Sequence, residues 1–279
     1  MTQQETLHIL KCRFEKIQAS FDVAITYFDA QDIHAFRVEV KKLRAFLHLV
    51  PTEVIVKLPA CLHQFYRMVG EIRNLQQQEQ RIHDAFICQG ELPQTYLNLL
   101  AIESAAAIRR AKQFAANRLS IPIEERQLLS TFTHHIKGNS QGFVRNTINR
   151  LQPLCDNRHP IDDEDLHSLR KYLKDFLYNH HNIENEATHI PPSILSDGKE
   201  SVSALTELLG QFQDLRSGLS LLQPIYIAQV TDAGEKKMLE GIKSKWEKDK
   251  AAIKDQIVST LLSDISAKRS PTNQHIMLN

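Results

Sequence analysis

The residues best suited to chemistry form a row of cations in the segment IHAFRVEVKKLRAFLHLV, residues 33–50. Residues three or four apart share one face of a helix, so the row would lie along one flank. Its members are His34, Arg37, Lys41, Arg44 and His48. An exposed helix usually mixes acidic and basic residues at this spacing, but this row holds no carboxylate. Because like charges repel, the row predicts an anionic ligand beside it.

An apolar seam on the same segment predicts how the row is positioned. The seam repeats at helical spacing and consists of Ile33, Phe36, Val40, Leu43, Leu47 and Val50. At about 100° per residue, the basic row lies roughly 110° round the helix from this seam. Asp32 is the predicted N-cap, and Pro51 marks the predicted end of the helix. We therefore expect a core-facing helix with one basic flank.

The same pattern recurs in LHSLRKYLKDFLYNHH, residues 166–181. A shift of 133 residues relates the two rows, and the second row contains His167, Arg170, Lys174, Tyr178 and His181. Its apolar seam is Leu166, Leu169, Leu173 and Phe176. A second pair of similar segments, MVGEIRN at 68–74 and LLGQFQD at 208–214, is related by a shift of 140 residues. This internal repeat predicts two helical halves with similar sites.

A third predicted helix, residues 58–87, has a polar row of its own around Gly70. Glycine inside a helix costs up to ~1 kcal/mol relative to alanine, so we expect it to admit a close neighbour or ligand. The cations of this row, predicted to join the first site, are His63, Arg67 and Arg81. A row that merely faces solvent is the alternative. Further candidate cations are Lys42, Arg73, Lys171, Lys243 and Lys250.

These motifs resemble the CHAD family, the conserved-histidine α-helical domain. The resemblance rests on HxxRxxxKKLR from His34, HxxRKxLKxxxY from His167 and an LGxxxD-like element after each, and it covers nearly the whole chain. It implies an all-α fold with two pseudo-symmetric four-helix-bundle halves forming one CHAD domain, and a central basic groove that binds inorganic polyphosphate. Asp175 and Leu177 stand where family members often carry arginine, and Asn74 replaces the usual aspartate. We therefore expect a less positive second half.

Composition agrees with a helical protein that has a sizeable core. The chain has 279 residues, of which 42% are hydrophobic and only nine are glycine. We expect one CHAD domain over residues 1–269, with halves at about 6–136 and 140–266, and a disordered tail at 270–279. The formal net charge is +1, so any anion site must be local, and a general nucleic-acid binder is disfavoured.

The sequence also predicts where the protein works. Its four cysteines lack metal-ligand spacing, its start lacks the features of a secretory signal, and no stretch reaches the roughly 18 apolar residues of a membrane span. We expect a cytoplasmic protein without a membrane partner, associated with polyphosphate granules.

The expected function is binding without catalysis, cofactor or metal. The sequence has no GxxxxGK[ST] loop, no acidic row opposite the basic rows, and no ExExK signature like that of the CYTH triphosphatases. Three alternatives remain: a metal-binding module built on the histidine pairs, a single-strand nucleic-acid binder, and a scaffold whose basic rows pair with internal carboxylates. Adjacent histidines point apart on a helix, and only Tyr178 could stack a base, so the first two are disfavoured.

Overall fold

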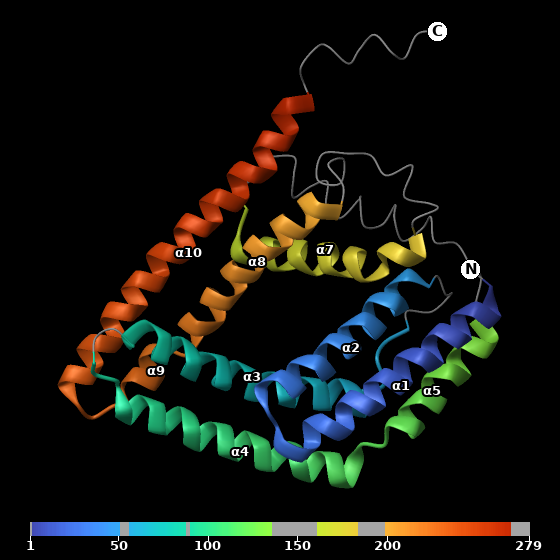
Figure 1. Cartoon of the computed structure of the whole chain (residues 1–279), viewed down its shortest axis with the longest axis horizontal. Helices are drawn as coiled ribbons and strands as arrows, with labels where there is room; N and C mark the ends of the chain where they lie inside the picture. Colours follow the sequence, from blue (N-terminus) through green and yellow to red (C-terminus); the bar gives the residue numbers. More distant parts are fainter. Residues whose placement is uncertain (1, 51–55, 88–89, 136–160, 184–198, 269–279) are drawn as a thin grey trace. The chain divides into compact units, whose positions relative to one another are not determined.

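The structure is a computed structural model that describes residues 2–50, 56–87, 90–135, 161–183 and 199–268. Within these ranges every regular element is a helix and no strand occurs, so the predicted all-α class is confirmed (Figure 1). The pseudo-symmetry of two halves stays a prediction. The tail predicted at 270–279 lies outside the described residues. None of the described helices is long and apolar enough to span a membrane.

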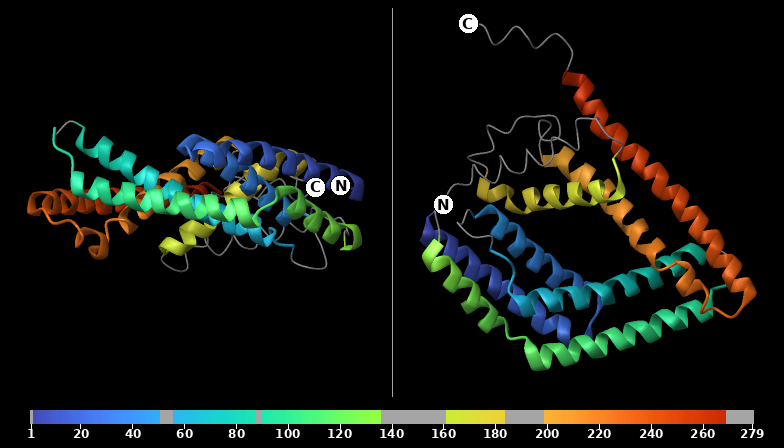
Figure 2. Two further views of the ribbon diagram at one scale, coloured as in Figure 1. Left: turned by 90° about the horizontal axis from the view of Figure 1, so that it is seen from below. Right: turned by 180° about the vertical axis from the view of Figure 1, so that it is seen from behind.

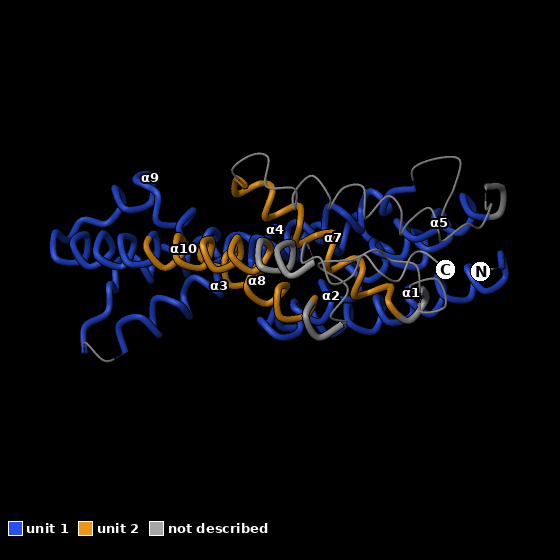
Figure 3. The backbone as a smooth tube through the Cα atoms, turned by 90° about the horizontal axis from the view of Figure 1, so that it is seen from above, with its two compact units in different colours: residues 1–138, 216–247 blue, residues 139–215, 248–279 orange. Residues whose placement is uncertain are grey.

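The chain divides into two compact units (Figure 3). Unit 1 comprises residues 1–138 and 216–247, and unit 2 comprises residues 139–215 and 248–279. Residues 216–247 thus fall in the second predicted half of the sequence but belong to unit 1. The helices are α1 Gln3–Tyr27, α2 Ala30–Leu49, α3 Ala60–Phe86, α4 Gln94–Arg118, α5 Ile121–His135, α7 Asp163–Ile183, α8 Lys199–Ser220, α9 Pro224–Ile227 and α10 Ala233–Lys268.

The core of unit 1 forms around α2. This helix packs against α1 and α3, while α4 packs on α3 and α5 on α1 (Figures 1 and 2). All six residues of the predicted seam of α2 are buried. The ring centroid of Phe36 from that seam lies 6.1 Å from that of Phe21 in α1 and 5.5 Å from that of Phe65 in α3. Burial of this face fixes the rotation of α2 and therefore the direction of its basic flank.

The start of α2 differs from the prediction. Its N-cap is Asp29, whose carboxylate accepts a hydrogen bond from the backbone N–H of Gln31 at 2.7 Å. The predicted N-cap, Asp32, is wrong; it lies in the first turn, where its charge still favours the helix dipole. The helix ends at Leu49, just before Pro51, which lies outside the described residues.

Polar contacts join residues 216–247 to the rest of unit 1. The carboxylate of Glu235 caps the start of α4, accepting from the backbone N–H of Thr95 at 3.0 Å and of Tyr96 at 3.3 Å. The Tyr96 hydroxyl donates to the carbonyl of Leu221 at 2.9 Å and accepts from Gln78 at 3.1 Å. Burial raises the pKa of Tyr96 to about 12, so the hydroxyl remains a donor at neutral pH.

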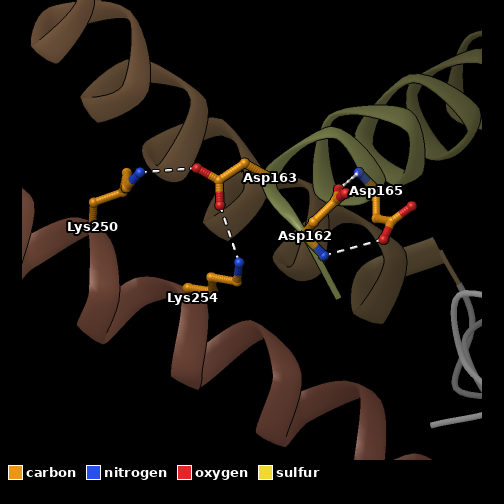
Figure 4. A network of polar contacts seen from close by, with 5 residues as sticks. All are labelled: Asp162, Asp163, Asp165, Lys250 and Lys254. Atoms are coloured by element: carbon orange, nitrogen blue, oxygen red, sulfur yellow. Dashed lines mark hydrogen bonds and ion pairs between the residues drawn. The ribbon is translucent and has the colours of Figure 1, made fainter. Parts of the chain in front are cut away.

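In unit 2, α7 buries its predicted seam of Leu166, Leu169, Leu173 and Phe176. Asp162 and Asp165 cap its start reciprocally, each carboxylate accepting from the other's backbone N–H. Asp163 binds two lysines of α10, Lys250 at 2.9 Å and Lys254 at 3.0 Å (Figure 4). Burial alone would raise the pKa of Asp163, but the hydrogen bonds and charges of the two lysines outweigh it and lower that pKa. The start of α7 is thus tied to α10 by charge.

Candidate functional site

Arg37 of α2 lies against α3 at Tyr66 and Gly70. Its Nη1 donates to the backbone carbonyl of Tyr66 at 2.8 Å, and its Cζ lies 4.3 Å from the centre of the Tyr66 ring. A Cβ built on Gly70 would meet Nη1 and lie 3.0 Å from Cζ. The close approach predicted at Gly70 therefore occurs, and the approaching group is a guanidinium from the neighbouring helix.

Two further arginines crowd Arg37. Burial lowers the pKa of Arg37; Tyr66 acts in the opposite direction, and the charges of Arg44 and Arg73 lower it further. The Nε atoms of Arg44 and Arg73 are buried and have no hydrogen-bond partner among the described residues. Within that part of the chain, none of the three guanidinium groups forms an ion pair. The three side chains are half-buried, so like charges lie near one another without a neutralising carboxylate among the described residues.

Other predicted cations of unit 1 differ in their surroundings. Lys42 pairs with Glu39 at 2.5 Å, and Arg13 of α1 lies 3.7 Å from the same carboxylate. Lys42 therefore fits the scaffold alternative, whereas Arg37, Arg44 and Arg73 do not. The exposed members of the predicted site are His34, His48, His63 and Arg67, and the partly buried ones are Lys41, Arg81 and Lys243.

The second row crowds two cations in unit 2. The Nε of Arg170 is buried and lacks a hydrogen-bond partner among the described residues. Burial lowers the pKa of Lys174 and the charge of Arg170 lowers it further, while Glu207 raises it. Nδ1 of His167 and Oε1 of Gln213 are hydrogen-bonded at 3.0 Å. Arg170 and Lys174 thus oppose each other's charge as the arginines of unit 1 do, but Glu207 offsets part of the charge of Lys174.

The remaining candidates of unit 2 are placed as follows. Lys171 is exposed and Tyr178 is partly buried, while the side chain of His181 lies outside the described residues. Lys250 is engaged by Asp163, and its Nζ lies 5.7 Å from the ring centre of Phe212. Its charge is therefore partly neutralised within unit 2.

Sequence reasoning missed Tyr66. The signal was present, because Tyr66 stands one turn before Gly70 on α3 and so shares a face with it. It could be interpreted only once Arg37 was known to reach that face. Among the described residues, no group of three or more His, Cys, Asp or Glu side chains is arranged to hold a metal ion.

The class of protein defined by this fold is an all-α domain with two related His/Arg/Lys helices. The CHAD domain model matches residues 8–223, so the chain belongs to the CHAD family. The family is one of helical domains associated with polyphosphate binding and metabolism. No curated protein sequence matches the chain.

Two solved structures are similar to this one. The crystal structure of the CHAD domain from the plant Ricinus communis superposes with a TM-score of 0.66 and 20% identity, covering 93% of this chain and 91% of that chain. PptA from Streptomyces chartreusis superposes with a TM-score of 0.63 and 12% identity, covering 95% of this chain and 99% of that chain. At these identities the likeness concerns the fold alone.

Proposed function

We propose that the protein binds inorganic polyphosphate and does not cleave it. The observation that carries the proposal is the cluster of Arg37, Arg44 and Arg73, three guanidinium groups that repel one another and form no ion pair among the described residues. Membership of the CHAD family supports polyphosphate as the anion. Arg170 and Lys174 of unit 2 supply a second, smaller group of cations.

The chemistry of the ligand suits these side chains. Polyphosphate is a flexible row of anions without bases, so neither stacking platforms nor base-edge donors are needed. Cations three and four residues apart on a helix lie ~5–6 Å from one another and can engage successive phosphates. Arginine adds a planar fork that binds two oxygens of one phosphate, whereas lysine acts as a compact charge.

We also propose a partner and a cellular location for the protein. Polyphosphate is the partner, no cofactor takes part, and the protein works in the cytoplasm at polyphosphate granules. A single groove lined by the rows of α2 and α7 remains a prediction. Single-stranded nucleic acid is the competing ligand.

Calorimetric titration with long-chain polyphosphate tests the proposal. The variant Arg44→Ala with Arg73→Ala removes two cluster cations, and Arg109→Ala with Arg126→Ala removes two exposed arginines of α4 and α5 as a matched control. We expect the first variant to bind about tenfold more weakly or worse, at about 1 kcal/mol or less per cation, and the control to bind like wild type. The melting temperature of the Arg44→Ala, Arg73→Ala variant should not fall below that of the control, because the substitutions remove charges that repel one another.

Three results would contradict parts of the proposal. A large drop in melting temperature for the cluster variant alone would identify these arginines as structural residues. Orthophosphate release from polyphosphate in the presence of Mg²⁺ would show catalysis. Displacement of bound polyphosphate by single-stranded RNA at equal charge concentration would favour nucleic acid as the ligand.

A further inference from the structure

We infer that Gly70 and Tyr66 are positioning residues that hold Arg37 ready for a phosphate group. The inference rests on the proposed function and assigns a role to a glycine and a backbone carbonyl that carry no charge. Its starting point is the position of Arg37, which three separate features of α3 define.

The three features together confine the guanidinium. The carbonyl of Tyr66 accepts from Nη1, the ring centre of Tyr66 lies 4.3 Å from Cζ, and Gly70, which has no Cβ, leaves room for the guanidinium. Only one of the five N–H donors of an arginine is used in that carbonyl bond. Arg37 therefore retains donors for a ligand while its side chain is already ordered. Ordering a side chain in advance removes part of the entropy cost of binding.

This arrangement is costly without a ligand, which argues against a purely structural role. Arg37 is held beside Arg44 and Arg73, whose charges disfavour its protonated form. A fold that needed only to fill the space at Gly70 could use alanine, which also favours the helix. Glycine at this position keeps a cation in a place where other cations oppose it.

Gly70→Ala separates positioning from folding. The added methyl would meet the end of a flexible side chain and not backbone, so Arg37 can swing away and the fold can persist. Arg37 then loses the Tyr66 carbonyl and ring. We expect polyphosphate affinity to fall by roughly three- to tenfold, with a melting temperature within a few degrees of wild type.

Gly241→Ala is the matched control. Gly241 is an exposed glycine of α10 in the same unit, and a Cβ added there meets nothing within 4 Å. It receives the same gain in helix propensity without touching a cation, so its melting temperature should rise and its affinity should stay unchanged.

A double-mutant cycle makes the test independent of the ligand. In an Arg37→Ala background the guanidinium is gone, so Gly70→Ala should raise the melting temperature as Gly241→Ala does. Wild type could fail to bind polyphosphate while the cycle shows coupling between positions 37 and 70 in melting temperature. In that case the proposed function is wrong, but Gly70 and Tyr66 still position Arg37. If wild type binds and Gly70→Ala binds equally tightly, or Gly70→Ala acts identically with and without Arg37, the inference is overturned.

Discussion

The two copies of the motif treat their first arginine differently. In unit 1, Arg37 is enclosed by the carbonyl, ring and glycine of α3. In the second copy, the 140-residue shift puts Thr206 in place of Tyr66, and its hydroxyl donates to the carbonyl of Val202 within its own helix. A Cβ added at Gly210, the counterpart of Gly70, meets nothing within 4 Å. The repeat therefore preserves the residue types of the row more faithfully than the surroundings that hold them.

The two copies of the motif also differ in positive charge. Three cationic positions of the first copy, Lys42, Arg44 and Arg73, correspond to Asp175, Leu177 and Gln213 in the second. Gln213 is hydrogen-bonded to His167, so an amide that holds a histidine replaces a crowded guanidinium. The difference indicates that unit 1 provides the stronger electrostatic attraction for a polyanion.

The largest expected effect comes from removing the same two cations from each copy. Arg37→Ala with Lys41→Ala should weaken polyphosphate binding about tenfold or more, because it also breaks up the arginine cluster. Arg170→Ala with Lys174→Ala should weaken it only about threefold. Calorimetry in one buffer, with a long polyphosphate, measures both. Equal losses of affinity would show that the two copies contribute equally to binding. A larger loss from the second pair would show that unit 2 contributes more.

Exchanging one residue between the copies should have a smaller effect of predictable sign. Arg44→Leu should weaken binding a few-fold and Leu177→Arg should strengthen it, because each adds or removes one engaged cation. By analogy with nucleic acids, the slope of log affinity against log salt should become shallower by roughly one in the first variant and steeper by roughly one in the second. The two changes in slope should cancel in the combined variant, which keeps the net charge, so a combined slope that differs from wild type would contradict this expectation.

The anchoring of the two motif helices gives a third test. Both helices begin at an aspartate cap, Asp29 for α2 and Asp162 for α7, and α7 is in addition tied to α10 through Asp163. The folded-state pKa of Asp163 is lowered, so its contribution to stability is present above the usual pKa of 3.8 and is lost as pH falls through the folded value. Asp163→Asn should destabilise the protein at pH 7 by about 1 kcal/mol or less, because both ion pairs are partly exposed.

Chemical denaturation at pH 7 and at successively lower pH checks this expectation. The difference between wild type and Asp163→Asn should shrink as the pH falls below 3.8. Asp255→Asn, an exposed aspartate of the same α10, is the control and should change stability little at any pH. A difference that stays constant with pH would contradict the role of the two lysines.

The smallest expected effect concerns Lys174. Its folded-state pKa is lowered, first by burial and then by Arg170, so at neutral pH the fold holds a charged group that it disfavours. Lys174→Met should therefore raise the melting temperature by about 1 °C while weakening polyphosphate binding. This gain in melting temperature should disappear as the pH rises through the lowered pKa of Lys174 toward the usual 10.5, because Lys174 of wild type is then neutral. Scanning calorimetry at pH 7 and pH 10 measures it.

Much of the fold follows from periodicity, since the seams of α2 and α7 are buried as predicted. The cap of α2 was misplaced because Asp29 and Asp32 are chemically equivalent, and only the backbone path decides which one precedes the helix. The surroundings of Arg37 depend on which face of α3 meets α2, which is set by tertiary packing. The pairing of Lys42 with Glu39 was within reach of the sequence, because the two residues are three apart on one helix.

The fastening of residues 216–247 to unit 1 also has a consequence for biosynthesis. The cap of α4, Glu235, and the acceptor for the Tyr96 hydroxyl, Leu221, are translated only after residue 138 and all described residues of α7. From residue 138 to residue 247 the ribosome must add 109 residues, which takes roughly 5–20 s at typical speeds. During that interval the nascent first unit has an uncapped α4, and the Tyr96 hydroxyl lacks its acceptor, the carbonyl of Leu221. Chaperones that attend the emerging chain would meet it in this incomplete state.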